Sequence, residues 1–361
     1  MPLNSYVTLG RSGLRVSPFC LGAMTFGEDW GWGATPEGSS KIIGTFLERG
    51  GNFVDTANFY TKGHSEKIIG DFIAQDRARR ERMVLATKFF GNLYPGDPNG
   101  GGAGRKAISA QCEQSLRRLQ TDYIDLYWLH MNDRFTPIEE TLRALDDLVA
   151  SGKVRYIGFS DTPAWKVAQA QTTALMKGWT PLVALQLEYS LLERTIEGEL
   201  VPAAVEYGLG ITPWSPLKSG MLTGKYTRES AKTATPGRGA FVSRAFTEQA
   251  FTVLDVLVDV AKAAGTTPAR AALAWVVQRP AVASTIIGAR TMEQLLDNLG
   301  ALEVKLTTEQ VQKLDEASKP TLNFPHDFVE TIKAFGYNGA TIDGVAAPVN
   351  PMSPSTDGER Y

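Results

Sequence analysis

Residues 50–72 read GGNFVDTANFYTKGHSEKIIGDF and contain one complete strand-and-helix unit. The run FVDT at 53–56 predicts a short buried strand, and 65–75 has the apolar spacing of a helix. The small polar segment between them predicts a loop. Because the strand is apolar rather than alternating, we expect both of its faces to be covered, as in a parallel sheet.

The same unit recurs along the chain. The predicted strands are 19–26, 53–56, 83–89, 124–130, 154–159, 183–187, 209–214 and 284–288. The predicted helices are 38–49, 65–75, 106–119, 138–150, 164–175, 197–207, 247–264, 268–278, 291–300 and 307–318. These units predict an α/β protein, and eight of them close most simply into a (β/α)8 TIM barrel.

Three additions to the barrel are predicted. Residues 6–18 alternate and turn at Arg11-Ser12-Gly13, which indicates an N-terminal β-hairpin. A long loop, 218–245, follows strand seven, and a Pro- and Gly-rich tail occupies 320–361. We expect one domain, 1–361, with its barrel at about 19–318.

The composition is that of an ordinary globular protein. The chain has 361 residues, 43% of them hydrophobic, and a formal net charge of −2, which gives no electrostatic case for nucleic acid or an anionic membrane surface. No apolar run approaches the ~20 residues that span a membrane, and the N-terminus lacks a signal pattern. Cys20 and Cys112 suggest reduced core thiols, so we expect a cytoplasmic protein. Its three histidines lie far apart in sequence, so no metal site is expected. The oligomeric state stays open.

Four polar residues fall at strand ends or just beyond them: Asp55, Tyr60, Lys88 and His130. Each has an ordinary structural alternative. Asp55 could cap a turn, Lys88 could extend its stem out of a strand, and His130 could be a core histidine. In a TIM barrel, however, these positions share the end where active sites form.

The four side chains suit the reduction of a carbonyl by hydride, which needs a proton donor for the developing alkoxide. A tyrosine has an ordinary pKa of about 10, and we expect Lys88 to lower that of Tyr60. Asp55 would keep Lys88 charged and oriented. A neutral His130 could position the substrate oxygen.

These residues and their surroundings resemble the aldo-keto reductases, which are NADP(H)-dependent barrel oxidoreductases. The resemblance covers roughly 6–318 and includes FVDTANFY, YIDLYWLH, GKVRYIGFSD, LQLEYSLLER, PWSPLKSGMLTGKY and IIGARTMEQLLDN. It is closest to the bacterial sugar- and aldehyde-reducing branches and to the potassium-channel β subunits. It implies that Asp55, Tyr60, Lys88 and His130 form the catalytic tetrad.

The resemblance also implies a set of NADP(H)-binding residues. Ser160, Asp161 and Gln186 would lie near the nicotinamide amide, although Asp161 stands where the family usually has Asn, and Trp214 would stack on the ring. The remaining implied contacts are Ser215, Leu217, Lys218, Gly220 and Lys225 at the pyrophosphate, Gly288 and Arg290 at the phosphate-binding turn, and Gln294 and Asn298 at the adenine. Arg290 and Lys218 favour NADP(H) over NAD(H). Without the preceding IIGAR, 291–300 would be an ordinary outer helix.

A second glycine motif, GAGRKA at 102–107, fits G-x-G-x-x-A but does not directly follow a strand, so we interpret it as a flexible loop over the barrel mouth. The substrate, a small-molecule carbonyl compound, would contact loop side chains, and the candidates are Trp30, Trp32, Phe59, Phe90 and Met131. For the two tryptophans, simple loop packing is an equal alternative.

Two functions fit this sequence. The first is an NADPH-dependent reductase of aldehydes or ketones. The second is a cofactor-binding, redox-sensing partner protein with little turnover, of the channel β-subunit kind.

Overall fold

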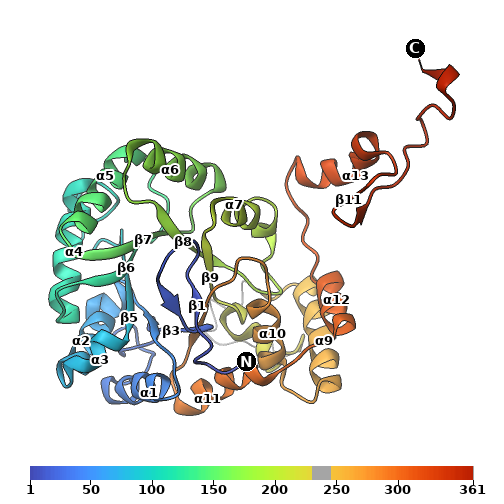
Figure 1. The fold of residues 1–361 in the computed structure, drawn as a ribbon. Coiled ribbons are helices and arrows are strands. Elements are labelled where there is room, and N and C mark those ends of the chain that lie inside the picture. The colour runs from blue at the N-terminus through green and yellow to red at the C-terminus, as the bar shows by residue number, and fades with distance from the viewer. Residues whose placement is uncertain (230–244, 361) are drawn as a thin grey trace. The chain divides into compact units, whose positions relative to one another are not determined.

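The structure, a computed structural model, describes residues 1–229 and 245–360, which divide into two compact units, 1–318 and 319–361. In the first unit, eight parallel strands form a ring enclosed by helices, which confirms the predicted TIM barrel (Figure 1). The strands are β3 (Phe19–Gly22), β4 (Phe53–Asp55), β5 (Val84–Phe89), β6 (Ile124–Leu129), β7 (Val154–Ser160), β8 (Leu182–Glu188), β9 (Gly210–Trp214) and β10 (Thr285–Gly288).

The ring follows chain order, with β10 paired to β3. On the other side of β10 the ring closes through residues 281–283, which lead into β10 and pair with β9. There Ile211 N donates to Ala281 O over 2.7 Å, and Ala283 N donates to Ile211 O over 2.9 Å. The barrel is therefore almost completely hydrogen-bonded around its circumference.

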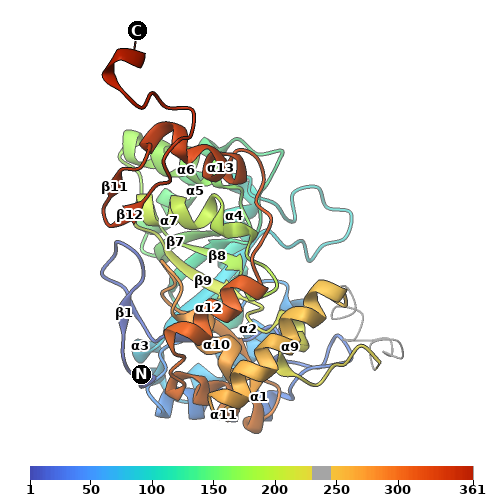
Figure 2. The same ribbon diagram turned by 90° about the vertical axis from the view of Figure 1, so that its right-hand side faces the viewer.

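Helices cover the outside of the ring, and Figure 2 shows α9, α10 and α12 side by side on one flank. The α-helices of this unit are α1 (Pro36–Glu48), α2 (His64–Ala74), α3 (Arg77–Arg82), α4 (Arg105–Leu119), α5 (Ile138–Ala150), α6 (Ala164–Lys177), α7 (Leu200–Tyr207), α9 (Glu248–Ala263), α10 (Pro268–Val277), α11 (Met292–Gly300) and α12 (Thr308–Ala317). Two 3₁₀ segments matter for the site, η1 (Tyr60–Gly63) and η3 (Lys218–Thr223).

Two apolar cores follow from the period of two in each strand. In β5, Leu85 and Phe89 pack in the large core beneath the helices, whereas Val84 and Ala86 pack in a separate core inside the barrel. The burial of both strand faces explains why the strands are apolar nearly throughout.

The predicted hairpin forms from β1 (Val7–Thr8) and β2 (Arg15–Val16), which are antiparallel. Its Leu9 and Val16 are fully buried and belong to the inner core. Gly10 has φ +58°, and a Cβ there would lie 2.3 Å from Val183 O, so only glycine fits this close approach. The hairpin therefore fills the end of the barrel at which the strands begin.

Some predicted boundaries are wrong. The strand predicted at 19–26 ends at Gly22, and Phe26 is buried in the following loop. The helix predicted at 197–207 begins only at Leu200. Of the predicted loop 218–245, the first part is the 3₁₀ segment η3, and residues 230–244 lie outside the described residues.

The second unit contains α13 (His326–Tyr337) and a small antiparallel pair, β11 (Thr341–Ile342) and β12 (Val345–Ala346). Its membership in one domain with the barrel stays a prediction. Among the described residues of both units, no helix has the length and apolar character needed to cross a membrane.

Candidate active site

The strand period that builds the inner core also aims the catalytic candidates into the barrel. Ala86 of β5 and Trp128 of β6 belong to the inner core. Two positions further along the chain stand Lys88 and His130, on the same face and at the end where the strands terminate. The predicted tetrad thus sits one layer above an apolar floor.

Lys88 and Asp55 form a buried ion pair in this layer. Their side chains are 0% and 4% exposed, and Lys88 Nζ donates to Asp55 Oδ2. Nζ also donates to Thr56 O over 2.7 Å, and Gln186 Nε2 donates to Asp55 Oδ1 over 3.1 Å. Burial opposes the charge on Lys88, but Asp55 and Tyr60 outweigh it and raise the pKa of Lys88, so this group stays charged. Burial raises the pKa of Asp55 against the pull of Lys88.

The ring of Tyr60 faces Lys88 of this pair, with its centroid 4.9 Å from Lys88 Nζ. The backbone of the next three residues is left-handed, with φ of 46° at Thr61, 62° at Lys62 and 90° at Gly63. Thr61 is fully buried, and its Oγ1 donates to Phe26 O over 2.9 Å. This sharp turn brings a residue from beyond β4 back over the strand ends.

The expected lowering of the Tyr60 pKa is wrong in net direction. Burial of the phenol is the larger effect and raises the pKa of Tyr60 above its ordinary value, while Lys88 opposes it. A neutral phenol is nevertheless the form that donates a proton. In the predicted role of Tyr60 as proton donor, Lys88 would stabilise the phenolate once the proton has left.

His130 follows β6 and lies beside Tyr60, with 5.7 Å between the ring centroids. Burial, assisted by the charge of Lys88, lowers the pKa of His130 to about 2. Its Nδ1 is buried and has no hydrogen-bond partner among the described residues. The imidazole is therefore neutral at physiological pH, as the sequence predicted, and can make a hydrogen bond to a bound oxygen.

Aromatic rings surround the phenol. Phe59 lies 5.3 Å from Tyr60 and 5.2 Å from His130, between centroids. Trp30 lies 6.4 Å from Tyr60, and Trp32 lies 5.7 Å from Trp30. The loop after β3 thus brings both tryptophans to this side of the mouth. Phe90 and Met131 lie farther out and line a neighbouring cavity.

The residues implied at the nicotinamide amide gather on neighbouring strands. Asp161, just after β7, donates its backbone N–H to Gln186 O over 3.1 Å. Trp214 Nε1 donates to Asp161 Oδ1 over 3.0 Å, and Ser160 Oγ donates to Asp161 Oδ2 over 3.3 Å. Although Asp161 keeps some exposed surface, partial burial raises the pKa of its carboxyl to about 6. Since Gln186 also bonds Asp55, this group is continuous with the tetrad.

The segment after β9 has an unusual backbone. Positive φ values occur at Ser215, Lys218, Ser219 and Gly220, and Leu217 O accepts from Gly220 N over 2.9 Å. Lys225 Nζ approaches this segment: it lies 3.5 Å from the position that a Cβ would take on Gly220.

Lys218 has partners within the chain. It donates to Glu188 over 2.8 Å and lies 3.7 Å from Glu193, so two carboxylates already offset its charge. This pairing weakens the predicted preference of Lys218 for an anion.

Side chains of α11 hold the predicted phosphate-binding turn after β10 in place. Gln294 Oε1 accepts from Arg290 N over 2.9 Å, and Asn298 Nδ2 donates to Gly288 O over 3.1 Å. Both side chains thus shape the turn, and their contact with an adenine stays a prediction. Arg290 Nε is buried without a partner among the described residues, and no atom lies within 4 Å of a Cβ built on Gly288. A guanidinium whose Nε has no partner among the described residues, at a helix N-terminus, fits a phosphate group.

Sequence reasoning missed several contacts. Neither the bond from Gln186 to Asp55 nor the carbonyl of Thr56 at Lys88 carries a sequence signal. Thr25, whose Oγ1 donates to Ala289 O over 3.0 Å, ties the tryptophan loop to the phosphate turn. The GAGRKA motif begins well after the end of β5 at Phe89; its first three residues lie in a loop, as interpreted, and Arg105–Ala107 open α4. Within residues 1–229 and 245–360, no group of three or more His, Cys, Asp or Glu could hold a metal ion.

Comparisons with known proteins identify the family of this chain. A sequence profile of the Aldo/keto reductase family matches residues 18–319. An uncharacterized oxidoreductase of Bacillus subtilis, YrpG, is 41% identical over 92% of this chain and 99% of its own length. An aryl-alcohol dehydrogenase of Pestalotiopsis microspora is 36% identical, and a norsolorinic acid reductase of Aspergillus flavus is 35% identical, each over 88% of this chain and 82% of the relative. The chain therefore belongs to the aldo/keto reductase family.

Proposed function

We propose that this protein reduces aromatic aldehydes or ketones to alcohols with NADPH, and that Tyr60 donates the proton. The observation that carries the proposal is the contact between the ring of Tyr60 and the ammonium group of Lys88, which is fully buried and paired to Asp55. A lysine is costly at such depth unless its charge is used and balanced.

NADPH, when bound, supplies the hydride. The chain's own residues manage the proton and the substrate oxygen. Neutral His130 hydrogen-bonds the carbonyl oxygen and orients it beside Tyr60. Tyr60 releases its proton to the developing alkoxide, and Lys88 stabilises the phenolate that remains. Asp55 keeps Lys88 in place. A positioned acid of this kind contributes ~100- to 10,000-fold.

The cofactor would be held by the residues at the ends of β7 to β10. Ser160, Asp161 and Gln186 would bind the amide of the nicotinamide, and Trp214 would cover the ring. Arg290 at the turn before α11 would bind the 2′-phosphate that distinguishes NADPH from NADH. The unpaired Nε of Arg290 supports this assignment.

Two observations support an aromatic substrate. The phenol of Tyr60 is surrounded by the rings of Trp30, Phe59 and His130. An aromatic ring of a substrate could pack against this group of rings. The relatives include a protein named as an aryl-alcohol dehydrogenase. The two buried free thiols, Cys20 and Cys112, support a reducing compartment such as the cytoplasm.

The test is NADPH absorbance with a panel of aromatic aldehydes, sugars and cyclic ketones, repeated with NADH. We expect turnover with aromatic aldehydes and NADPH, and loss of most turnover in Tyr60→Phe while NADPH affinity stays near normal. Tight NADPH binding without oxidation above background would instead favour the redox-sensing partner protein. Unchanged turnover in Tyr60→Phe would remove the phenol from the mechanism.

A further inference from the structure

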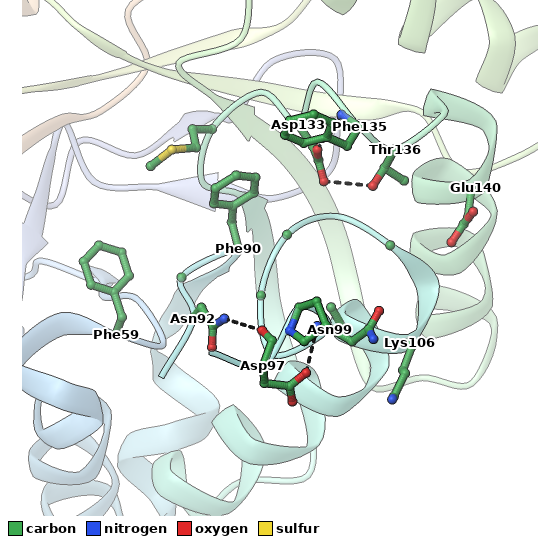
Figure 3. A pocket seen from close by; sticks show the side chains of 17 residues that line it. Phe59, Phe90, Asn92, Asp97, Asn99, Lys106, Asp133, Phe135, Thr136 and Glu140 are labelled. Carbon is green, nitrogen blue, oxygen red and sulfur yellow. Dashed lines mark hydrogen bonds between the residues drawn. The ribbon is translucent and has the colours of Figure 1, made fainter. Parts of the chain in front are cut away.

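A cavity of about 690 Å³ lies beside the catalytic residues, between the loop after β5 and the loop after β6 (Figure 3). This volume is within the usual range for small-molecule sites, about 300–1,000 Å³. Phe59, Phe90 and Met131 line it together with polar side chains of both loops. The mechanism above uses none of those polar side chains.

Phe59 connects the cavity to the site of reduction. Its ring contacts Tyr60 and His130, and it also lines the cavity. Met131, the residue after His130, lines the cavity as well. Phe59 and Met131 thus adjoin both the site of reduction and the cavity.

Side-chain bonds hold the near wall in place. Asn58 Nδ2 donates to Gly91 O and to Gln111 Oε1, each over 2.7 Å, and Phe90 N donates to Gln111 Oε1 over 2.9 Å. Asn58 and Gln111 are both almost fully buried. The start of the loop after β5 is therefore fixed to the loop of Tyr60, so the cavity is preformed there.

Apolar side chains on the cavity side of Phe59 are exposed to solvent. Phe135 at the rim is 96% exposed, and Met131 is 42% exposed. Asp133 fixes the backbone of this rim, because its Oδ1 accepts from Phe135 N over 2.8 Å. The Phe135 ring, which extends from this fixed backbone into solvent, has apolar surface for a ring of a ligand to cover.

The far end of the cavity is acidic. Asp97 uses Oδ1 to accept from Asn99 N, and Glu140 uses Oε1 to accept from Arg105 N, which leaves Asp97 Oδ2 and Glu140 Oε2 with no protein donor in the described part of the chain. Lys106 supplies one positive charge against the carboxylates of Asp97, Asp133 and Glu140. This balance disfavours an anion and favours neutral hydroxyl groups, which donate to carboxylates.

We propose that this cavity is a subsite for the distal ring of an extended, two-ring aryl carbonyl substrate. The distal ring packs on Phe59, Phe90 and Phe135, and a phenolic hydroxyl on it donates to Asp97 or Glu140. The inference rests on the proposed function, because it takes Tyr60 as the point at which the substrate carbonyl is reduced.

The test compares four aldehydes: benzaldehyde, and 4-(benzyloxy)benzaldehyde whose distal ring carries a hydroxyl, a methoxy or a carboxylate group. The variant is Asp97→Asn combined with Glu140→Gln, since each new amide keeps an oxygen for the backbone N–H. Asp259→Asn combined with Glu206→Gln makes the same charge change on the exposed faces of α9 and α7 and serves as the control.

We expect the cavity variant to lower kcat/KM for the hydroxyl substrate about tenfold, the loss of one hydrogen bond to a charged group. It should raise kcat/KM for the carboxylate substrate and change benzaldehyde and the methoxy substrate less than twofold. The control should change none of them. Equal effects on all four substrates, or no effect on any, would overturn the subsite.

A binding measurement separates this inference from the proposed function. Calorimetric titration of the alcohol product of the hydroxyl substrate needs no turnover. If no aldehyde is reduced, the proposed function fails, but a tenfold weaker Kd in the cavity variant still supports the cavity as a binding site. An unchanged Kd rejects it.

Discussion

Replacement of Lys88 by Met separates the structural role of the buried pair from its chemical role. In the wild type, Lys88 and Asp55 balance each other's charge at almost zero exposure. Lys88→Met leaves Asp55 buried, with Gln186 Nε2 as a remaining donor. An uncompensated charge of this kind costs about 3–5 kcal/mol. Asp55→Asn should cost a similar amount, because Lys88 then loses its buried counter-charge and keeps only neutral partners, such as the carbonyl of Thr56.

The double variant, Asp55→Asn with Lys88→Met, removes both charges at once. We expect it to cost no more than about 2 kcal/mol, less than either single change, because no buried charge is left unpaired. Its activity should nevertheless stay as low as that of Lys88→Met, about 100- to 10,000-fold below the wild type, since nothing stabilises the phenolate of Tyr60. Stability and activity would thus separate in one protein.

Urea denaturation followed by tryptophan fluorescence measures the stability, and NADPH oxidation with an aromatic aldehyde measures the activity. The stability deficit of Lys88→Met should also shrink as the pH falls from 8 to 5. Burial already raises the pKa of Asp55, and loss of Lys88 raises it further, so a proton can then neutralise the stranded carboxylate. Additive costs of the two single changes would refute the reasoning, as would recovery of activity in the double variant.

Three more predictions concern single residues. His130 has a pKa of about 2 in the folded protein and about 6.5 when unfolded, so its contribution to stability should fall by ~1.4 kcal/mol per pH unit below about pH 6.5, a slope that His130→Gln should reduce. Arg290→Ala should weaken NADPH at least about tenfold, the loss of a charged hydrogen bond, and NADH far less, as measured by fluorescence titration. The pKa of Asp161 is about 6 in the folded protein and about 3.9 when unfolded, so its cost is absent below about pH 4, grows as the pH rises towards 6 and is complete above that value. Asp161→Asn should therefore stabilise the protein by at most about 1 kcal/mol at pH 8, after allowance for exposure, and not at pH 4.

Each of these has a clear contrary result. A limb of the kcat/KM profile between pH 5 and 8 that disappears in His130→Gln would show that the imidazole titrates there. Equal losses of affinity for NADPH and NADH in Arg290→Ala would show that Arg290 does not bind the 2′-phosphate. A melting temperature of Asp161→Asn that differs from the wild type equally at pH 4 and pH 8 would mean that the carboxyl has no raised pKa.

The barrel and its tetrad could be predicted because both depend on local patterns. Eight apolar strand runs give the parallel sheet, and the period of two carries Lys88 to the inner face two positions after Ala86. The strand predicted at 19–26 was too long for a related reason. Phe26 is fully buried in the large core although it stands in a loop, and an apolar residue buried in a loop resembles one buried in a strand.

Features that depend on long-range packing could not be predicted. The pKa of Tyr60 is raised because the folded chain buries the phenol, and neighbouring residues alone do not give the extent of that burial. The cavity takes Asp97 from a loop and Glu140 from the first turn of α5, and nothing in the sequence indicates that these two segments meet. The pairing of Lys218 with Glu188 likewise depends on the fold, and the contact of Lys218 with a cofactor stays a prediction.

The hairpin at the start of the chain limits where substrate enters the barrel and product leaves it. Leu9 and Val16 fill the end at which the strands begin, so a small molecule approaches Tyr60 from the opposite end. Arriving aldehyde and departing alcohol then share one entrance. An alcohol retained by the phenylalanines beside that entrance would delay the next turnover, so an extended product should inhibit more strongly than a compact one.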